Sequence, residues 1–330
     1  MAGENRTPSD RALDGTEGGA ARPTGWKRWT PVAARLLVPA LVVFWLVRYA
    51  DLRDLGQALA RISPLAFAPA LACSLLIMVI GGLRWRVMMG AFGAREVPSR
   101  AQLVWLFFVG LFYNTFIPGA VGGDVVRGVI TRRCFDQSVG SYVVVLLERL
   151  IGMTGMVVPV AIGLLVGPEV FTTGELLSGL AVAGIAALAL TVFVLASGRL
   201  SSHLTQLPSV RRPSLLGVAF VLSLVSHFCG ITVVYSLARG MDLPVSYAGL
   251  VLVVPIALTA GFLPLAVMGI GAREVTLVAM VHLLGVDPEH GVALSLAYAG
   301  VNLVVAGIGG VLQLLGRRAG DAAALSPPTA

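Results

Sequence analysis

Long apolar stretches separated by short polar segments dominate this sequence. A helix needs about twenty apolar residues to cross roughly 30 Å of hydrocarbon. This pattern predicts an all-α, polytopic integral membrane protein with six full spans. The stretches that are long enough lie at about 32–48, 64–82, 139–167, 175–197, 214–238 and 290–315.

Two further apolar regions, about 101–137 and 247–286, are interrupted near their centres by glycine, proline and charge. Segment 114–127, NTFIPGAVGGDVVR, shows this interruption most clearly. We expect each region to enter and leave the membrane on one side as a re-entrant helical hairpin. In the alternative, all four half-segments cross fully, which makes about ten spans. Both schemes leave the two chain ends on the same side.

The two interruptions are related in sequence. FIPGAVGGDVVR at 116–127 aligns without a gap with FLPLAVMGIGAR at 262–273. Pro118 then matches Pro264 and Arg127 matches Arg273, 146 residues apart in both cases. Three predicted spans separate the interruptions, and this odd number turns the second repeat upside down. The pattern predicts an inverted repeat, with repeat regions at about 98–167 and 244–315 and with hairpins that meet near the midplane around a polar cavity.

Backbone that leaves a helix inside hydrocarbon loses its hydrogen-bond partners, which is tolerated only where protein or a water-filled cavity surrounds it. A helix that restarts after the break presents free N–H groups and a positive dipole end, which suit an anion. Gly122-Gly123 could form a turn with positive φ or allow a close backbone approach. The predicted helix-break residues are Pro118, Gly122, Gly123, Pro264, Gly269 and Gly271.

Composition and charge support the membrane class. Of the 330 residues, 57% are hydrophobic and 12% are charged, and the net charge is +7. The basic residues are scattered over short loops, so an excess of positive charge on the cytoplasmic side explains them better than nucleic-acid binding does. We therefore expect both termini in the cytoplasm. Residues 1–31 and 317–330 are predicted to be disordered tails around a transmembrane domain at 32–316.

Several motifs in these regions resemble one known family. They are Arg84-Trp85, Pro98, the run Asn114, Pro118, Gly122-Gly123-Asp124 and Arg127, the pair Glu148-Arg149, and Gly269-Ile270-Gly271-x-Arg273-Glu274. Together they are similar to the lysylphosphatidylglycerol synthase transmembrane family, which usually has Asp-Arg where this chain has Glu148-Arg149. The resemblance covers about residues 32–316.

The resemblance implies a flippase-like protein of the bacterial inner membrane that moves a lipid or lipid-linked intermediate between leaflets. Its expected partners are the bilayer and an anionic phospholipid or a polyprenyl-phosphate-linked lipid. Larger members carry a soluble aminoacyl-transferase domain after the membrane part. Because only about fifteen polar residues follow the last predicted helix, we expect that domain to be absent.

The candidate substrate-binding residues are Arg127, Arg273, Asn114, Arg149 and Arg84. A guanidinium group suits phosphate oxygens, so Arg127 and Arg273 could bind a phosphate-bearing headgroup. They could equally form internal ion pairs with Asp124 and Glu274. Arg84, together with Trp85 and Arg86, fits an ordinary interfacial belt, with a headgroup role as the alternative.

Three acids, Asp124, Glu148 and Glu274, are candidates for gating or proton coupling. Glu148-Arg149 could gate the cavity or lie at the cytoplasmic interface. The sequence shows no constellation of catalytic or metal-ligating residues, so we expect no enzyme activity, no metal and no cofactor. Two alternatives to a lipid transporter are a membrane-embedded transferase acting on a lipid carrier and a small-solute transporter built on the same hairpins.

Overall fold

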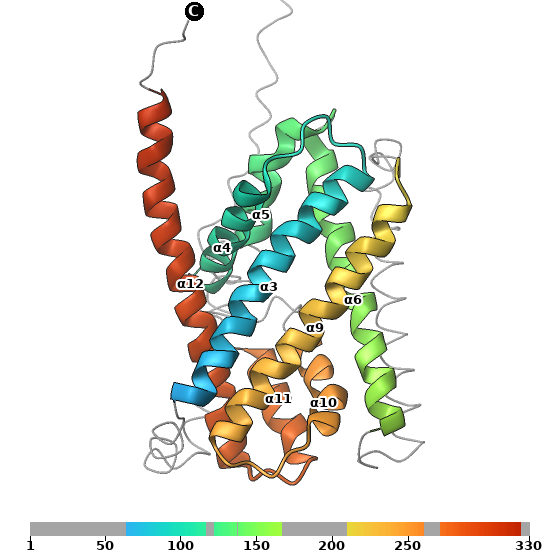
Figure 1. Cartoon of the computed structure of the whole chain (residues 1–330), viewed down its shortest axis with the longest axis vertical. Coiled ribbons are helices and arrows are strands. Elements are labelled where there is room, and N and C mark those ends of the chain that lie inside the picture. Colours follow the sequence, from blue (N-terminus) through green and yellow to red (C-terminus); the bar gives the residue numbers. More distant parts are fainter. Residues whose placement is uncertain (1–63, 117–121, 137, 167–209, 261–270, 325–330) are drawn as a thin grey trace, which may run out of the picture. The chain divides into compact units, whose positions relative to one another are not determined.

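A computed structural model describes residues 64–116, 122–136, 138–166, 210–260 and 271–324 of the chain. The regular secondary structure in this part of the chain is entirely helical (Figure 1). A short 3-10 turn, Arg132–Cys134, follows the third helix. The α-helices are α3 (Pro64–Ala91), α4 (Arg100–Phe116), α5 (Gly122–Thr131), α6 (Ser138–Val166), α9 (Ser214–Gly240), α10 (Tyr247–Ala260), α11 (Ala272–His282) and α12 (Pro288–Ala324).

Four of these helices are long and apolar enough to cross a membrane. Their spanning parts are Leu65–Ala91, Gly140–Val166, Ser214–Gly240 and Pro288–Gly316. They confirm the spans predicted at 64–82, 139–167, 214–238 and 290–315. The predicted spans at 32–48 and 175–197 lie outside the described residues, as do the N-terminal tail and residues 325–330. The chain is thus a multi-pass helical membrane protein.

Each interrupted region forms two short helices instead of one long one. Region 101–137 contains α4 and α5, and region 247–286 contains α10 and α11. The connecting residues, 117–121 and 261–270, lie outside the described part of the chain. The predicted break residues Pro118, Pro264 and Gly269 fall in these connections. The residues that follow the connections restart a helix, as the sequence predicts.

The packing of the first four helices is repeated by the last four. A shift of 146 residues carries α4 onto 246–262, which compares with Tyr247–Ala260 for α10. The same shift carries α3 near α9, α5 near α11 and α6 near α12. The contacts between helices have the same symmetry. Helix α4 packs against α12, the equivalent helices α10 and α6 pack against each other, and α3 packs against its own equivalent, α9. The repeat seen in twelve residues therefore extends over four pairs of helices.

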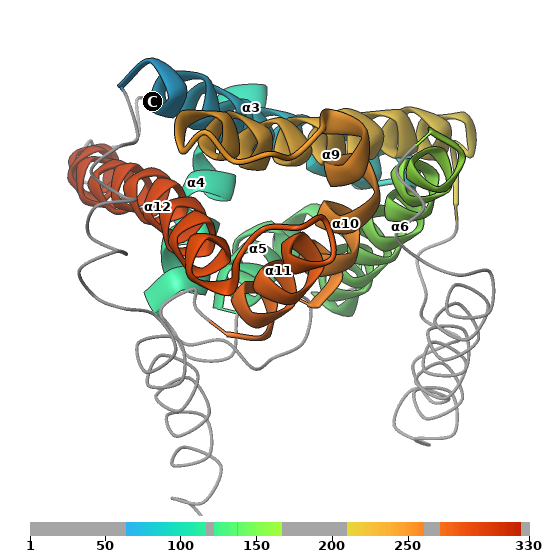
Figure 2. The same cartoon turned by 90° about the horizontal axis from the view of Figure 1, so that it is seen from below.

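Equivalent helices run in opposite directions. In Figure 1, α3 rises along the long axis while α9 descends beside it, and α6 descends while α12 rises. The end view in Figure 2 shows α3 and α9 side by side, with α12 and α6 on either flank. This opposite direction is what an inverted repeat requires.

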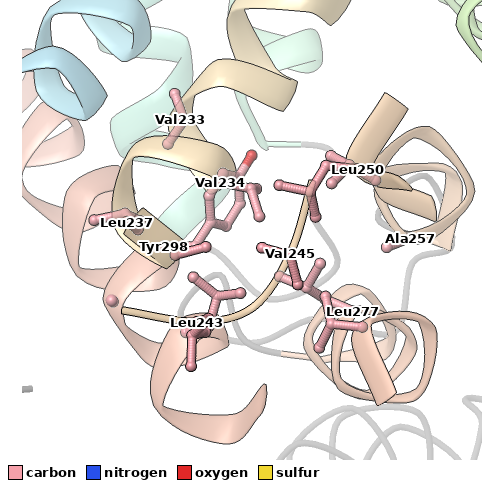
Figure 3. Close-up of a cluster of buried hydrophobic side chains, with 14 of the residues drawn as sticks. Val233, Val234, Leu237, Leu243, Val245, Leu250, Ala257, Leu277 and Tyr298 are labelled. Carbon is pink, nitrogen blue, oxygen red and sulfur yellow. The ribbon is translucent and has the colours of Figure 1, made fainter. Parts of the chain in front are cut away.

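Two clusters of buried apolar side chains hold the helices together. The larger cluster joins helices α9, α10, α11 and α12 and includes Leu237, Leu250, Leu277 and Tyr298 (Figure 3). The smaller is built around Trp85, Met88 and Met89 of α3, together with side chains from α4 and α6. Because lipid tails are as apolar as these side chains, close packing contributes more to helix association here than exclusion of water does. The smaller cluster adjoins the charged residues described next.

Candidate functional site

A buried carboxylate links three helices in the first half of the repeat. Glu148 of α6 is 1% exposed. Its Oε1 accepts a hydrogen bond of 2.8 Å from Nε of Arg84 on α3, and its Oε2 accepts one of 2.9 Å from Nη1 of Arg127 on α5. An ionisable group inside a membrane protein costs about 2.5–3.5 kcal/mol on insertion scales, so these partners have a large effect on stability.

A second carboxylate extends this network toward the surface. Asp124, in the first turn of α5, pairs through Oδ1 with Arg127 and through Oδ2 with Arg149 of α6. The charges therefore alternate in the order Arg84, Glu148, Arg127, Asp124, Arg149. We call these five residues the charge chain. Three guanidinium groups face two carboxylates, which leaves the fully ionised charge chain with one positive charge in excess.

Helix α9 also contacts the charge chain. Ser223 Oγ lies 3.0 Å from Nη1 of Arg84 and accepts its hydrogen bond. One turn further along α9, Nε2 of His227 lies 2.8 Å from the carbonyl oxygen of Gly152 on α6. These contacts connect α9 to α3 and α6 at the level of the charge chain.

Two aromatic rings enclose the Arg127 guanidinium. Its Cζ lies 4.4 Å from the ring centroid of Phe107 and 5.4 Å from that of Trp85. A cation at this distance from an aromatic ring is attracted by the ring's quadrupole. Trp85 itself is fully buried, and its indole N–H has no hydrogen-bond partner among the described residues. A buried donor without a partner is unusual, and this one lies beside the charge chain.

Asn114 links the end of α4 to the start of α5. Its Oδ1 accepts a hydrogen bond of 2.7 Å from the backbone N–H of Gly123. A Cβ atom placed on Gly123 would lie 2.6 Å from the carbonyl carbon of Gly110 in α4. Among the described glycines, only Gly93 and Gly285 have positive φ. Gly122 and Gly123 thus begin α5, and Gly123 serves a close backbone approach rather than a positive-φ turn.

A second ion pair occupies the equivalent place in the other half. Nε of Arg273 donates a hydrogen bond of 2.7 Å to Oε1 of Glu274. The other oxygen, Oε2, accepts one of 2.7 Å from the N–H of Gly271, the N-cap of α11. The Arg273 guanidinium also lies 4.8 Å from the ring of Tyr298 on α12. Part of the N–H set expected to attract an anion is therefore used internally, here by Glu274 and in α5 by Asn114.

The ion pairs considered at the sequence level, Arg127 with Asp124 and Arg273 with Glu274, are both present. Sequence reasoning missed three longer-range pairs of the charge chain, Arg84 with Glu148, Arg127 with Glu148 and Asp124 with Arg149. It also missed Ser223. A lone glutamate within an apolar helix indicated that a buried partner was needed but not which one.

One interpretation from sequence was wrong. Trp85 is not part of an interfacial aromatic belt, because it is 0% exposed in the core with Met88 and Met89. Arg84 likewise points into the charge chain rather than lying among belt residues. Arg86, two residues further on, binds the segment between α3 and α4, with Nη1 donating to the carbonyl oxygens of Val97 and Pro98.

The fold and the site together define a class: helical membrane proteins with two related sets of helices and a buried arginine–carboxylate network. Comparison with known proteins identifies one family within this class. The chain belongs to the family described as the lysylphosphatidylglycerol synthase TM region, whose family model matches residues 32–310.

The chain is also similar to part of another membrane protein. A UPF0104 membrane protein from Methanothermobacter thermautotrophicus is 30% identical over 101 residues. This match covers 31% of the present chain and 28% of that protein, so the chain matches little more than a quarter of the relative's length.

Proposed function

We propose that this protein is a flippase-type transporter that moves an anionic lipid, or a lipid-linked intermediate, between the leaflets of a bacterial inner membrane. The observation that supports it most directly is the charge chain. Its residues are buried among apolar helices, and its guanidinium groups outnumber its carboxylates by one. An excess positive charge of this kind attracts a phosphate-bearing headgroup while the acyl chains remain in the bilayer.

The accessible end of the charge chain is the part that would meet a headgroup. Side-chain exposure is 2% for Glu148 and 8% for Arg127, and it rises to 26% for Arg149. We therefore assign Arg149 and Arg127 as headgroup ligands. Arg84 and Glu148 hold Arg127 in place, and Arg273 is the second candidate ligand in the other half of the repeat.

The short helices α4, α5, α10 and α11 would form two re-entrant hairpins. Helix α4 packs against α5, and α10 packs against α11, so the two helices of each interrupted region lie side by side. This packing supports the hairpin scheme, with six full spans, over the scheme with about ten spans.

The distribution of exposed charge supports an orientation. Arg95 and Arg211 both pair with Asp136, which brings the segments after α3, before α6 and before α9 to one end of the helices. We call this the basic end. Its exposed arginines are Arg95, Arg100, Arg132, Arg133, Arg211 and Arg212. The positive-inside rule places the basic end in the cytoplasm. The opposite end carries the acids Asp242, Asp287 and Glu289.

Transport, and not a chemical reaction, is the proposed activity. The groups of the charge chain are arginines and carboxylates with one positive charge in excess, an arrangement that suits binding and release of an anion. Movement would follow the lipid's own gradient or be coupled to protons, with Asp124, Glu148 and Glu274 as carriers.

Reconstitution into liposomes tests this proposal. Trace fluorescent lipids with anionic, zwitterionic and cationic headgroups, and a polyprenyl phosphate, would be incorporated with the purified protein. Addition of dithionite then reports how fast the inner-leaflet probe reaches the outer leaflet. We expect faster exchange of anionic lipids than of cationic ones. Folded protein that accelerates none of the lipids would overturn the proposal.

Two variants separate the site from the scaffold. Arg149→Gln should slow anionic lipid exchange about ten-fold, the effect of one lost charge-assisted hydrogen bond. Arg100→Gln, which changes an exposed arginine at the basic end, should leave the rate unchanged. Equal rates for Arg149→Gln and wild type would remove Arg149 from the headgroup site. Transport of a water-soluble anion instead of any lipid would favour the small-solute alternative.

A further inference from the structure

Asp124 lies between two arginines that come from different helices. Its two carboxylate oxygens are used separately: Oδ1 pairs with Arg127 of α5, and Oδ2 pairs with Arg149 of α6. Two oxygens that share one negative charge and each meet a separate guanidinium make the same pattern of contacts as the non-bridging oxygens of a phosphodiester. Asp124 thus fills a position whose chemistry suits a phosphate.

Glu148 and Arg127 are more deeply buried than this position. Glu148 is 2% exposed at its side chain, Asp124 is 13% exposed and Arg149 is 26% exposed. Glu148 also has a partner on each oxygen, Arg84 and Arg127. If Glu148 moved away from its partners, buried charges would be left unpaired. Asp124, in contrast, can separate from Arg149, which lies at the more accessible end of the charge chain. The exchangeable link is therefore the one made by Asp124.

We propose that Asp124 is a built-in substitute for the headgroup phosphate. In this scheme, which rests on the proposed function, a lipid phosphodiester binds Arg127 and Arg149 by displacing the Asp124 carboxylate. Asp124 returns to the arginines when the lipid leaves. The displaced carboxylate remains in the first turn of α5, where the positive end of the helix dipole favours a negative charge.

The charge balance indicates the class of headgroup. The ionised charge chain has an excess of one positive charge, so a group with a single negative charge neutralises it. A phosphodiester carries one negative charge, whereas a phosphomonoester carries up to two and would leave the site negative. In a low-dielectric interior, uncompensated charge is costly. The indole N–H of Trp85, for which no described residue is a hydrogen-bond acceptor, belongs to a ring that lies beside Arg127 and is a further donor.

An internal competitor has a consequence for turnover. A headgroup held by two guanidinium groups would leave slowly if nothing replaced it, because its contacts with Arg127 and Arg149 would be lost in an apolar environment. With Asp124 available, the arginines exchange one carboxylate for one phosphate and are paired in both states. Asp124 thereby weakens binding and speeds release.

Binding of soluble short-chain lipids to the purified, full-length protein in detergent tests this role. Dihexanoyl phosphatidylglycerol is the phosphodiester probe, and dihexanoyl phosphatidic acid is the monoester probe. Asp124→Asn should bind the phosphodiester about ten-fold more tightly than wild type, because one charge-assisted contact no longer has to be exchanged. Asp124→Glu keeps the competing carboxylate and should stay nearer to wild type.

Asp136→Asn is the matched control. Asp136 also pairs with two arginines, Arg95 and Arg211, but it lies at the exposed basic end, so its substitution should leave affinity unchanged. If Asp124→Asn does not fold, Arg149→Gln decides the question, since it should bind the phosphodiester about ten-fold more weakly. If Arg149→Gln bound the phosphodiester as tightly as wild type does, the proposed site would be overturned.

The remaining outcomes are equally decisive. Unchanged or weaker phosphodiester binding by folded Asp124→Asn overturns the role of Asp124, even if the wild type exchanges lipids in liposomes. Tighter binding by Asp124→Asn in a protein that exchanges no lipid keeps the binding site and overturns only transport. Wild-type preference for the monoester overturns the phosphodiester class.

Discussion

Gly163 of α6 and Gly309 of α12 are 146 residues apart, and each faces the backbone of a short helix in the other half of the repeat. A Cβ on Gly163 would lie 2.6 Å from Cα of Leu252 in α10, and a Cβ on Gly309 would lie 2.6 Å from the carbonyl carbon of Phe108 in α4. Small residues allow this close approach between membrane helices. The same device therefore holds each hairpin against a long helix.

Alanine at either glycine should loosen the corresponding hairpin. We expect Gly163→Ala and Gly309→Ala each to destabilise the protein by about 1–3 kcal/mol, the usual effect of overpacking. Thermal unfolding in detergent, followed by tryptophan fluorescence, measures the change. Gly300→Ala is the control on α12, because nothing lies within 4 Å of its added Cβ. Equal stability of all three variants would contradict the close approach.

Neutralising Glu148 should have a much larger effect than neutralising an exposed acid. Glu148→Gln leaves the buried guanidinium groups of Arg84 and Arg127 without their shared charge, and we expect a loss of about 3–5 kcal/mol. Arg84→Met should lose less stability, since Glu148 still pairs with Arg127. Asp136→Asn should change stability by no more than about 0.5 kcal/mol. A Glu148→Gln protein that unfolds at the wild-type temperature would refute this ranking.

Removal of the Asn114 side chain should open the first hairpin. Asn114→Ala leaves the Gly123 N–H without its acceptor, at a cost of about 1–3 kcal/mol. Hydrogen–deuterium exchange should rise in peptides that cover 122–131. Asn114→Asp keeps an acceptor oxygen near the positive end of α5 and should stay close to wild type. Similar exchange in both variants would show that this bond does not hold the hairpin.

The second hairpin depends on Glu274 for two separate interactions. Glu274→Ala removes both the partner of Arg273 and the acceptor for the Gly271 N–H, and we expect a loss of about 3 kcal/mol. Glu274→Gln retains an acceptor and should lose about 1 kcal/mol less. Thermal unfolding distinguishes them, with Glu289→Ala as an exposed acidic control. If glutamine and alanine lose the same amount, the bond to Gly271 contributes nothing.

The sequence predicted the long helices and the interruptions well, for a simple reason. Four described spans are runs of apolar residues whose length matches the membrane, and this signal does not depend on neighbours. The relation between Pro118 and Pro264 likewise required only an alignment of the chain with itself. The Arg127–Asp124 pair could be considered from sequence because side chains three positions apart share one face of a helix. The Arg273–Glu274 pair could be considered because a buried charge needs an opposite one and these two residues are adjacent in the chain.

Other features depended on which helices are neighbours. Trp85 reads as an interfacial residue from its arginine neighbours, yet the packing of α3 against α4 and α6 encloses it. Ser223 carries no signal of its own in an apolar helix, and it joins the site only because α9 packs against α3.

The sequence by itself determined that this is a multi-pass helical membrane protein with two related interruptions and ionisable groups that need partners. Only the tertiary structure decided that Glu148 joins Arg84 to Arg127 and that Asp124 joins Arg127 to Arg149. The physical reason is that a charge buried in hydrocarbon is stable only beside an opposite charge, but this requirement does not specify which residue supplies the opposite charge. That choice is made by helix packing, which brings residues 64 positions apart, such as Arg84 and Glu148, within hydrogen-bonding distance.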